Sequence, residues 1–265
     1  MELKGASVLL TGASGGIGRA LAKELALRGA RLGLVGRNAA SLQDVIDIVR
    51  CAGSEAVSIV ADIGTTDGRH VAVQAMGKSF NGTDILINNA GVTAFADFST
   101  QDEAEIECIV RTNLLAPMTL TRSILSTMQI AGRGKIVNIG STFGSIGFAW
   151  FASYSASKFG LRGFSEALRR ELAGSGIDVL YAAPRAVKTA LNTEAVNRMA
   201  EHVKMNMDEP AWVAGKIVTA LANDKKDIYI GFPESLFARI NSVLPRLIDR
   251  ALHKQNKDSK KFISS

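Results

Sequence analysis

The stretch ASVLLTGASGGIGRALAKEL, residues 6–25, contains the transition that decides the fold. A short apolar run reaches Thr11, and a glycine-rich turn then leads into a segment with apolar residues at helical spacing. Gly12, Gly16 and Gly18 are placed so that the chain turns sharply, backbone N–H groups can approach a phosphate, and the helix packs closely on the strand. A glycine turn that binds nothing is the alternative, but the strand before it and the helix after it favour a phosphate site.

Six further strand-like runs follow, separated by longer segments with helical periodicity. Continuous apolar runs are typical of strands buried on both faces, as in a parallel sheet covered by helices. The sequence therefore predicts a single-domain α/β protein with a Rossmann-like, doubly wound parallel sheet of about seven strands and helices on both faces. The expected strands lie at residues 6–12, 30–36, 56–62, 84–91, 134–141, 177–184 and 227–231.

Two regions depart from this alternation. Residues 190–209 follow the sixth expected strand as a long helical or irregular insertion, which is the usual position of a lid. Residues 234–265 follow the last strand as an amphipathic extension with a polar tail that we expect to fray. We expect residues 1–233, including the insertion, to form the catalytic domain.

Composition excludes several classes of protein. Cys51 and Cys108 are the only cysteines among 265 residues and form no CxxC pair, which indicates neither a disulfide framework nor a zinc site and fits a reducing, cytoplasmic compartment. The net charge is +6, of which +4 comes from residue 246 onward, where six lysines and arginines face two aspartates. The remainder is nearly balanced, so we expect no nucleic-acid partner. We also expect no secretory signal, no membrane-spanning segment and no metal site.

Several motifs occur in one order along the chain: TGASGGIG at 11–18, NNAG at 88–91, Asn113, Ser141 at the end of IVNIGS, and YSASK at 154–158. The first has the spacing TGxxxGxG and the last the spacing YxxxK. In this order and spacing, over residues 6–189, the chain resembles the short-chain dehydrogenase/reductase family. The resemblance implies an oxidoreductase with a nicotinamide cofactor.

Tyr154 and Lys158 are four residues apart, so a helix places them on one face. A lysine cation within about 4–6 Å, together with the positive nicotinamide of an oxidised cofactor, should lower the tyrosine pKa and let it act as the acid or base. Ser141 is suited to hydrogen-bond the same substrate oxygen. The resemblance assigns Lys158 also to the nicotinamide ribose, and Asn113 to a water in the proton relay. Each residue alone could instead be an ordinary structural polar group.

The end of the second expected strand indicates which nicotinamide cofactor binds. An NAD-selective site places a carboxylate there, whereas a 2′-phosphate requires a cation. Gly36 followed by Arg37 offers space and a guanidinium, and Ser14 adds a hydroxyl donor. We therefore expect NADP(H), the alternative being that Arg37 is a solvated surface residue.

The resemblance implies most of the other cofactor contacts. It places an aspartate matching Asp62 at the adenine and the threonine matching Thr189 at the nicotinamide carboxamide. The remaining expected contacts are Gly12, Gly16, Ile17, Gly18, Asn89, Ala90, Gly91, Tyr154, Lys158, Pro184 and Val187.

Arg185 stands where the family usually has a glycine, after Pro184 in YAAPRAVKT. One hypothesis is that its side chain points into the pocket mouth toward an anionic substrate group or the cofactor pyrophosphate. The other is that it turns outward to an acidic residue of the insertion, such as Glu194. Met199 is a candidate substrate contact, because methionines adapt to irregular apolar surfaces; packing of the insertion on its own domain is the alternative.

Residues 234–254 combine apolar residues at helical spacing with arginines, and Pro245 should end one helix or begin the next. Such a segment can rest on an anionic membrane, but we favour packing on its own domain or on a partner subunit.

The favoured function is reversible, NADP(H)-dependent interconversion of a ketone or aldehyde and an alcohol, with a preference for lipid-like or acyl substrates. The alternatives are a non-catalytic NADP(H)-binding regulator or scaffold, a membrane-surface interaction protein, and a sugar-nucleotide epimerase or dehydratase, which usually has a larger substrate domain. The resemblance implies a homodimer or homotetramer.

Overall fold

The computed structural model describes residues 2–263, together with all their side chains except that of Lys254. Within this range, all strands join in one parallel sheet with the order β3-β2-β1-β4-β5-β6-β7. The strands are β1 (Ser7–Thr11), β2 (Arg31–Gly36), β3 (Ala56–Val60), β4 (Ile85–Asn88), β5 (Gly134–Ile139), β6 (Ile177–Pro184) and β7 (Asp227–Ile230). Each expected strand is confirmed, with ends that differ by a few residues.

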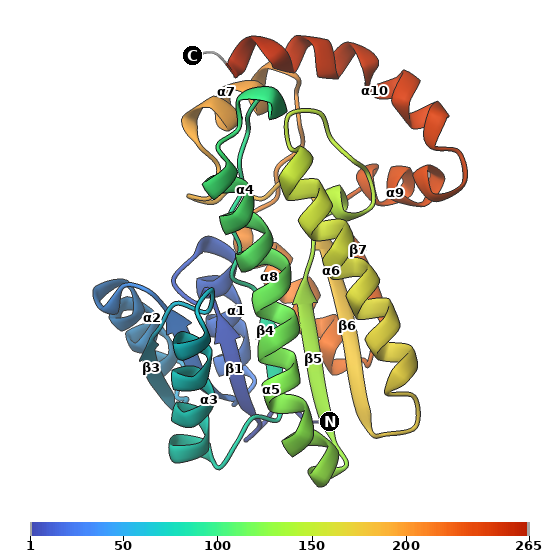
Figure 1. The fold of residues 1–265 in the computed structure, drawn as a ribbon. Coiled ribbons are helices and arrows are strands. Elements are labelled where there is room, and N and C mark those ends of the chain that lie inside the picture. The colour runs from blue at the N-terminus through green and yellow to red at the C-terminus, as the bar shows by residue number, and fades with distance from the viewer. Residues whose placement is uncertain (1, 264–265) are drawn as a thin grey trace.

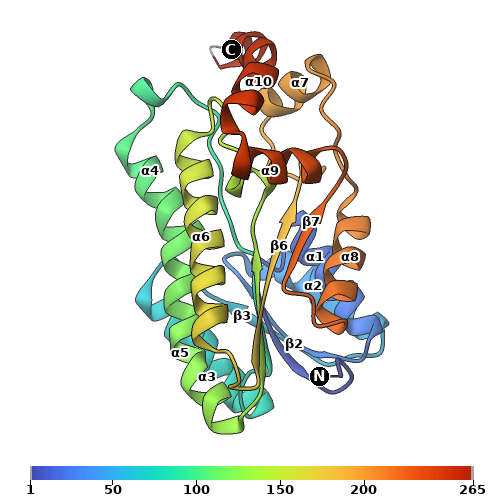
Figure 2. The ribbon, with the colours of Figure 1, turned by 90° about the vertical axis from the view of Figure 1, so that its right-hand side faces the viewer.

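Helices cover both faces of the sheet, as Figure 2 shows. The longer helices are α1 (Gly16–Leu27), α2 (Ala39–Cys51), α3 (Thr66–Phe80), α4 (Glu103–Val110), α5 (Ala116–Ala131), α6 (Ala152–Glu171), α7 (Glu194–His202), α8 (Pro210–Ala222), α9 (Glu234–Val243) and α10 (Pro245–Ser259). Short helical turns are η1 (Phe98–Thr100), η2 (Arg111–Leu115), η3 (Thr142–Gly144) and η4 (Lys260–Phe262). The predicted doubly wound fold is confirmed.

The side chains of each central strand alternate between two apolar cores. In β1, Val8 and Leu10 face the core formed with α1, α2 and α8, whereas Leu9 faces the core formed with α3, α5 and α6. This division follows from the pleat of a strand, because successive side chains point to opposite faces. Two covered faces explain why the strand sequences are continuously apolar.

The extension lies beyond the carboxyl ends of the strands, where α7, α9 and α10 gather (Figures 1 and 2). Pro245 is the first residue of α10, as predicted, because its fixed φ and missing N–H suit a first helical turn. The expected fraying of the tail is wrong for residues 255–263. These residues continue α10 and form η4, and the Trp150 indole donates a hydrogen bond to the Asn256 carbonyl at 3.0 Å. Residues 264 and 265 lie outside the described range.

The start of α1 is packed tightly against the turn before it. A Cβ atom on Gly18 would lie 2.1 Å from the carbonyl oxygen of Gly12. By contrast, a Cβ atom on Gly163, inside α6, would meet nothing within 4 Å.

We predict opposite effects of alanine at these two helical glycines. Gly18→Ala should lower the free energy of unfolding by about 1–3 kcal/mol, because backbone must move to admit the methyl group. Gly163→Ala should raise it by about 0.5–1 kcal/mol, because alanine has the higher helix propensity. Urea denaturation of both variants checks this, and equal effects would contradict the tight packing at Gly18.

Candidate active site

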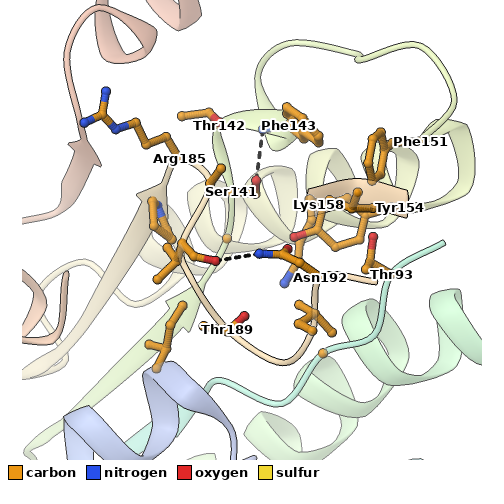
Figure 3. Close-up of a pocket in the computed structure, with 18 of the residues that line it drawn as sticks. Thr93, Ser141, Thr142, Phe143, Phe151, Tyr154, Lys158, Arg185, Thr189 and Asn192 are labelled. Carbon is orange, nitrogen blue, oxygen red and sulfur yellow. Dashed lines mark hydrogen bonds between the residues drawn. The ribbon is translucent and has the colours of Figure 1, made fainter. Parts of the chain in front are cut away.

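Three of the predicted catalytic residues line one pocket at the carboxyl edge of the sheet. Ser141 follows the end of β5, and Tyr154 and Lys158 lie on the first turns of α6. Figure 3 shows Ser141 on one side of the cavity and Tyr154 and Lys158 on the other. The predicted residues that also line this pocket are Ile17, Asn89, Gly91, Pro184, Arg185, Val187, Thr189 and Met199. Those that do not are Gly12, Ser14, Gly16, Gly18, Arg37, Asp62, Ala90 and Asn113.

The Ser141 hydroxyl is oriented by the backbone. Its oxygen accepts a hydrogen bond from the Phe143 N–H at 3.1 Å, at the start of η3 (Figure 3). The hydroxyl hydrogen is therefore available for another acceptor, since a serine hydroxyl can accept and donate at once. That acceptor can be the Tyr154 oxygen, whose pKa a hydrogen bond with Ser141 lowers, or a substrate oxygen.

Lys158 is buried beside Tyr154. Its Nζ atom donates to the Ile139 carbonyl at 2.9 Å and lies 5.8 Å from the centroid of the Tyr154 ring. Burial lowers the pKa of Lys158 to about 8. Burial also raises the pKa of Tyr154 to about 12, against the opposing hydrogen bond with Ser141. The predicted lowering of the Tyr154 pKa concerned the site with an oxidised cofactor bound; in the protein alone, burial raises this pKa against the Ser141 hydrogen bond.

Asn113 lies in a single π-helical turn, η2, between α4 and α5. Its side chain bonds the loop after β4: Oδ1 accepts from the Val92 N–H at 2.9 Å and Nδ2 donates to the Val92 carbonyl at 2.8 Å. Nδ2 also donates to the Ser157 hydroxyl on α6 at 3.0 Å. The side chain thus ties this loop to the helix that carries Tyr154 and Lys158. A π turn inserted in a helix is frequent at functional sites, but no residue pattern here predicts one.

The glycine turn closes against the loop after β6. A Cβ atom on Gly16 would lie 2.6 Å from Cγ2 of Thr189, so only glycine allows this contact without displacement. Gly12 has a φ of 63°, which is the left-handed region that glycine adopts readily. The turn therefore leads from β1 into the N-terminus of α1 beside Ile17 and Thr189 of the pocket wall. This geometry fits the pyrophosphate of a dinucleotide at a helix N-terminus.

The residues expected to contact the adenosine lie at the glycine turn and at the ends of β2 and β3. A Cβ atom on Gly36 would lie 3.3 Å from the Ser14 hydroxyl, so Ser14 faces the end of β2. Arg37 is exposed and makes no hydrogen bond or ion pair with any described residue. Asp62 uses Oδ1 to accept from the Gly64 N–H at 2.8 Å, which leaves its other oxygen for a ligand. These positions fit an adenosine with a 2′-phosphate.

The Arg185 guanidinium pairs with two carboxylates and points away from the catalytic residues (Figure 3). It donates to both oxygens of Asp208, at 2.8 and 3.0 Å, and to Glu234 at 3.0 Å. Asp208 belongs to the 190–209 segment, so the arrangement corresponds to the outward alternative. The acidic residue of that segment is Asp208 and not the example Glu194, which pairs with Arg198 at 3.3 Å. The two carboxylates raise the pKa of Arg185.

An apolar wall completes the pocket. Met199 is fully buried in α7 and packs in one cluster with Phe148, Phe151 and Val196. Phe143 stacks on Phe148 with ring centroids 4.9 Å apart. These aromatic residues were not among the site residues expected from the sequence. The signal for them is the presence of Phe143, Phe148 and Phe151 within the short loop between Ser141 and Tyr154.

Comparison with known proteins places the whole arrangement among oxidoreductases. A family model described as short chain dehydrogenase matches residues 6–200. The ketoacyl reductase HetN of Nostoc sp. is 35% identical over 255 residues, which cover 94% of this chain and 88% of that protein. The 3-oxoacyl-[acyl-carrier-protein] reductase FabG of Vibrio cholerae is 34% identical over 197 residues, covering 74% of this chain and 79% of the relative.

Solved structures have the same fold. A metagenomic short-chain oxidoreductase in complex with NADP superposes with a TM-score of 0.74 at 30% identity, covering 87% of this chain and 98% of its own. A short-chain dehydrogenase/reductase from Burkholderia phymatum in complex with NAD has a TM-score of 0.85 at 23% identity, covering 94% and 96%. At that identity the second likeness concerns the fold alone.

The buried lysine leads to a prediction about stability. Below about pH 8, Lys158 is charged in both the folded and the unfolded protein, and burial of this charge opposes folding. Between about pH 8 and 10.5, its pKa in the unfolded chain, Lys158 loses its proton on folding. The destabilisation therefore decreases as the pH rises through this range. Lys158→Met should therefore raise the free energy of unfolding by about 1–2 kcal/mol at pH 7, after the loss of one hydrogen bond, and by less at pH 10.

Lys135→Met is the matched control. Lys135 is equally buried, but it is paired with Asp224 and donates to the Leu221 carbonyl at 2.9 Å. Its replacement should destabilise the fold, because the carbonyl loses its partner. Thermal unfolding of both variants at pH 7 and pH 10 measures the difference. A Lys158→Met protein less stable than the wild type at pH 7 would contradict the argument.

Proposed function

The chain belongs to the short-chain dehydrogenase family, and we propose that it is an NADP(H)-dependent oxidoreductase that interconverts a ketone or aldehyde and the corresponding alcohol. The observation that carries the proposal is the convergence of Ser141, Tyr154 and Lys158 on one pocket. The same pocket reaches Ile17 and Thr189 beside the glycine turn. A regulator that only binds the cofactor would require the glycine turn and Arg37 but not the catalytic group.

The cofactor would be held mainly by residues at the ends of five strands, β1, β2, β3, β4 and β6. The glycine turn and the start of α1 would bind the pyrophosphate, and Ser14 and Arg37 would bind a 2′-phosphate. Asp62 and residues 89–91 would contact the adenosine, and Lys158, Pro184, Val187 and Thr189 the nicotinamide half. When bound, the nicotinamide supplies the hydride to a carbonyl carbon or accepts it from an alcohol carbon. A relative's complex with NADP supports this choice of cofactor.

Tyr154 supplies the proton in the direction of reduction. A pKa raised to about 12 keeps its hydroxyl protonated at neutral pH, so the oxygen can donate to the substrate oxygen as negative charge develops there. Ser141 donates a second hydrogen bond to the same oxygen, since its own acceptor site is occupied by the Phe143 N–H. In the direction of oxidation the same oxygen would take up the proton of the alcohol.

The substrate we propose is a ketone on an acyl or other lipid-like chain. Phe143, Phe151, Val196 and Met199 line the pocket beyond Tyr154 and offer apolar contact surface. Two relatives are named for ketoacyl and 3-oxoacyl reduction, and their names support a carbonyl on such a chain. Arg185 has both acidic partners within the protein, so we propose it as a support of the pocket wall and not as a substrate ligand.

A cytoplasmic location and a homodimer or homotetramer complete the proposal. Cys51 and Cys108 are both free and exposed, which suits a reducing compartment. Val110, Leu115 and Met118 are exposed apolar residues along α4, η2 and α5, a surface that a second copy could cover.

We predict that Arg37→Asp shifts cofactor preference. The dissociation constant for NADPH should rise at least about tenfold, because a charge-assisted bond to the 2′-phosphate is replaced by repulsion. The dissociation constant for NADH should remain unchanged or decrease. Arg28→Asp, which changes an exposed arginine at the end of α1, is the control for net charge. Fluorescence titration with both cofactors measures the constants, and an unchanged NADPH/NADH ratio would refute the role of Arg37.

We predict that Tyr154→Phe abolishes turnover but not cofactor binding. The first step is a screen of NADPH oxidation with aliphatic, acyl-thioester, steroid and sugar carbonyls. For the best substrate, Tyr154→Phe should lower kcat by at least about 100-fold, the usual contribution of a positioned acid. Tyr229→Phe, which removes a hydroxyl bonded to Ser145 outside the pocket, should retain activity. Full turnover by Tyr154→Phe would refute the mechanism.

A further inference from the structure

The junction of α9 and α10 exposes large apolar side chains. Val243 is 77% exposed and Leu244 56%, and Leu236 and Leu247 are about half exposed. Leu236 and Val243 are seven residues apart in α9 and therefore lie on the same side of that helix. Isolated exposed apolar residues are common, but a contiguous group of them indicates a binding surface. We call this group, together with the neighbouring Arg239, Arg246 and Arg250, the elbow surface.

The arginines of the elbow surface have no acidic partner within the described residues. The side chains of Arg239, Arg246 and Arg250 are exposed and make no ion pair or hydrogen bond with a described residue. Arg246 and Arg250 are four residues apart, so they extend from the same face of α10. Asp249 is also exposed in this segment, which leaves a charge of three minus one, or +2, over residues 236–250. The surface is therefore both apolar and cationic.

The opposite side of the two helices is packed on the domain. Ala238 and Ile248 are buried in a cluster that includes Ile146, and the Asn241 side chain donates to the Ser145 carbonyl at 2.8 Å. Glu234, in the first turn of α9, is held by Arg185. The inner face thus packs on its own domain, as the sequence analysis favoured, and the fold does not require the side chains of the elbow surface.

We propose that the elbow surface binds the surface of a bilayer that contains anionic lipids. The apolar side chains would enter the boundary between headgroups and acyl chains, and the arginines would pair with lipid phosphates, as in interfacial amphipathic helices. Among the described residues, no helix is both long enough and apolar enough to cross a membrane. The contact therefore lies along the bilayer surface.

Other occupants agree less well with these side chains. In a two-fold contact with a second copy, the same patch faces itself, so the arginines of one copy would approach those of the other. A nucleic acid would pair with the arginines but would leave Val243, Leu244 and Leu247 without an apolar partner. An anionic bilayer satisfies both kinds of side chain.

Helix α10 connects the elbow surface to the pocket wall. Leu252 and Phe262, from α10 and η4, pack in the same cluster as Val196 and Met199 of the pocket wall, and Figures 1 and 2 show α10 lying beside α7 beyond the strand ends. Binding to the bilayer would thus bring the pocket near the membrane. This link to a lipid-like substrate rests on the proposed function, whereas the binding itself does not.

Vesicle flotation of the full chain tests the proposal. Wild-type protein should float with vesicles of equal parts phosphatidylglycerol and phosphatidylcholine, and much less with phosphatidylcholine alone or at high salt. Val243→Asp/Leu247→Asp and, separately, Arg246→Gln/Arg250→Gln should each lower binding about tenfold or more. Ile130→Asp, at an 89% exposed position on α5, is the matched control and should bind as the wild type does.

Circular dichroism establishes whether each variant is folded. If Val243→Asp/Leu247→Asp does not fold, Arg246→Gln/Arg250→Gln still tests the proposal. Absence of wild-type binding to the anionic vesicles would overturn the proposal, as would equal binding by wild type and folded variants. Light scattering adds a further outcome, since conversion of an oligomer to monomer by Val243→Asp/Leu247→Asp would assign the surface to a second copy. None of these outcomes depends on NADPH turnover, so failure here and failure of the proposed function are distinguishable.

Discussion

Hydrogen bonds between the ends of β1 and β4 hold the two halves of the site together. The buried Thr11 hydroxyl accepts from the Asn89 and Ala90 N–H groups, at 3.0 and 3.1 Å, and donates to the Ile87 carbonyl at 3.3 Å. Asn89 Nδ2 donates back to the carbonyls of Thr11 and Gly12. The glycine turn leaves one of these strands, and the loop bonded by Asn113 leaves the other. Their relative position, and with it the pocket, depends on this contact.

A second polar path fixes the helix that carries Tyr154 and Lys158. Asn88 on β4 donates to Asn138 on β5 at 2.8 Å, and Asn138 donates to Ser165 on α6 at 2.8 Å, all within the buried interior. Buried polar groups are costly unless they are paired, so such a network specifies one arrangement of its elements. Lys158 adds to this cost below about pH 8, because burial disfavours its charged form. A site that opposes folding in this way is consistent with a functional role for it.

The sequence was sufficient for the strands and for placing Ser141, Tyr154 and Lys158 in the pocket, because the strands and the YxxxK pair are local patterns. Apolar runs revealed each strand, and Tyr154 and Lys158 are neighbours in any helix. It was insufficient where the outcome depends on contacts distant along the chain. Arg185 bonds Glu234 from 49 residues away, and the sign of the Tyr154 pKa shift follows from burial that no four-residue spacing encodes. The π turn at Asn113 has no known sequence signal.

Hydrogen–deuterium exchange with and without NADPH tests most directly whether these strand ends form one cofactor site. The account predicts that NADPH slows exchange together in the glycine turn, in residues 89–92 and in residues 185–192, because one ligand spans the ends of β1, β4 and β6. NADH at the same concentration should protect the same segments less. No protection by NADPH, or protection confined to segments away from these strand ends, would contradict the account.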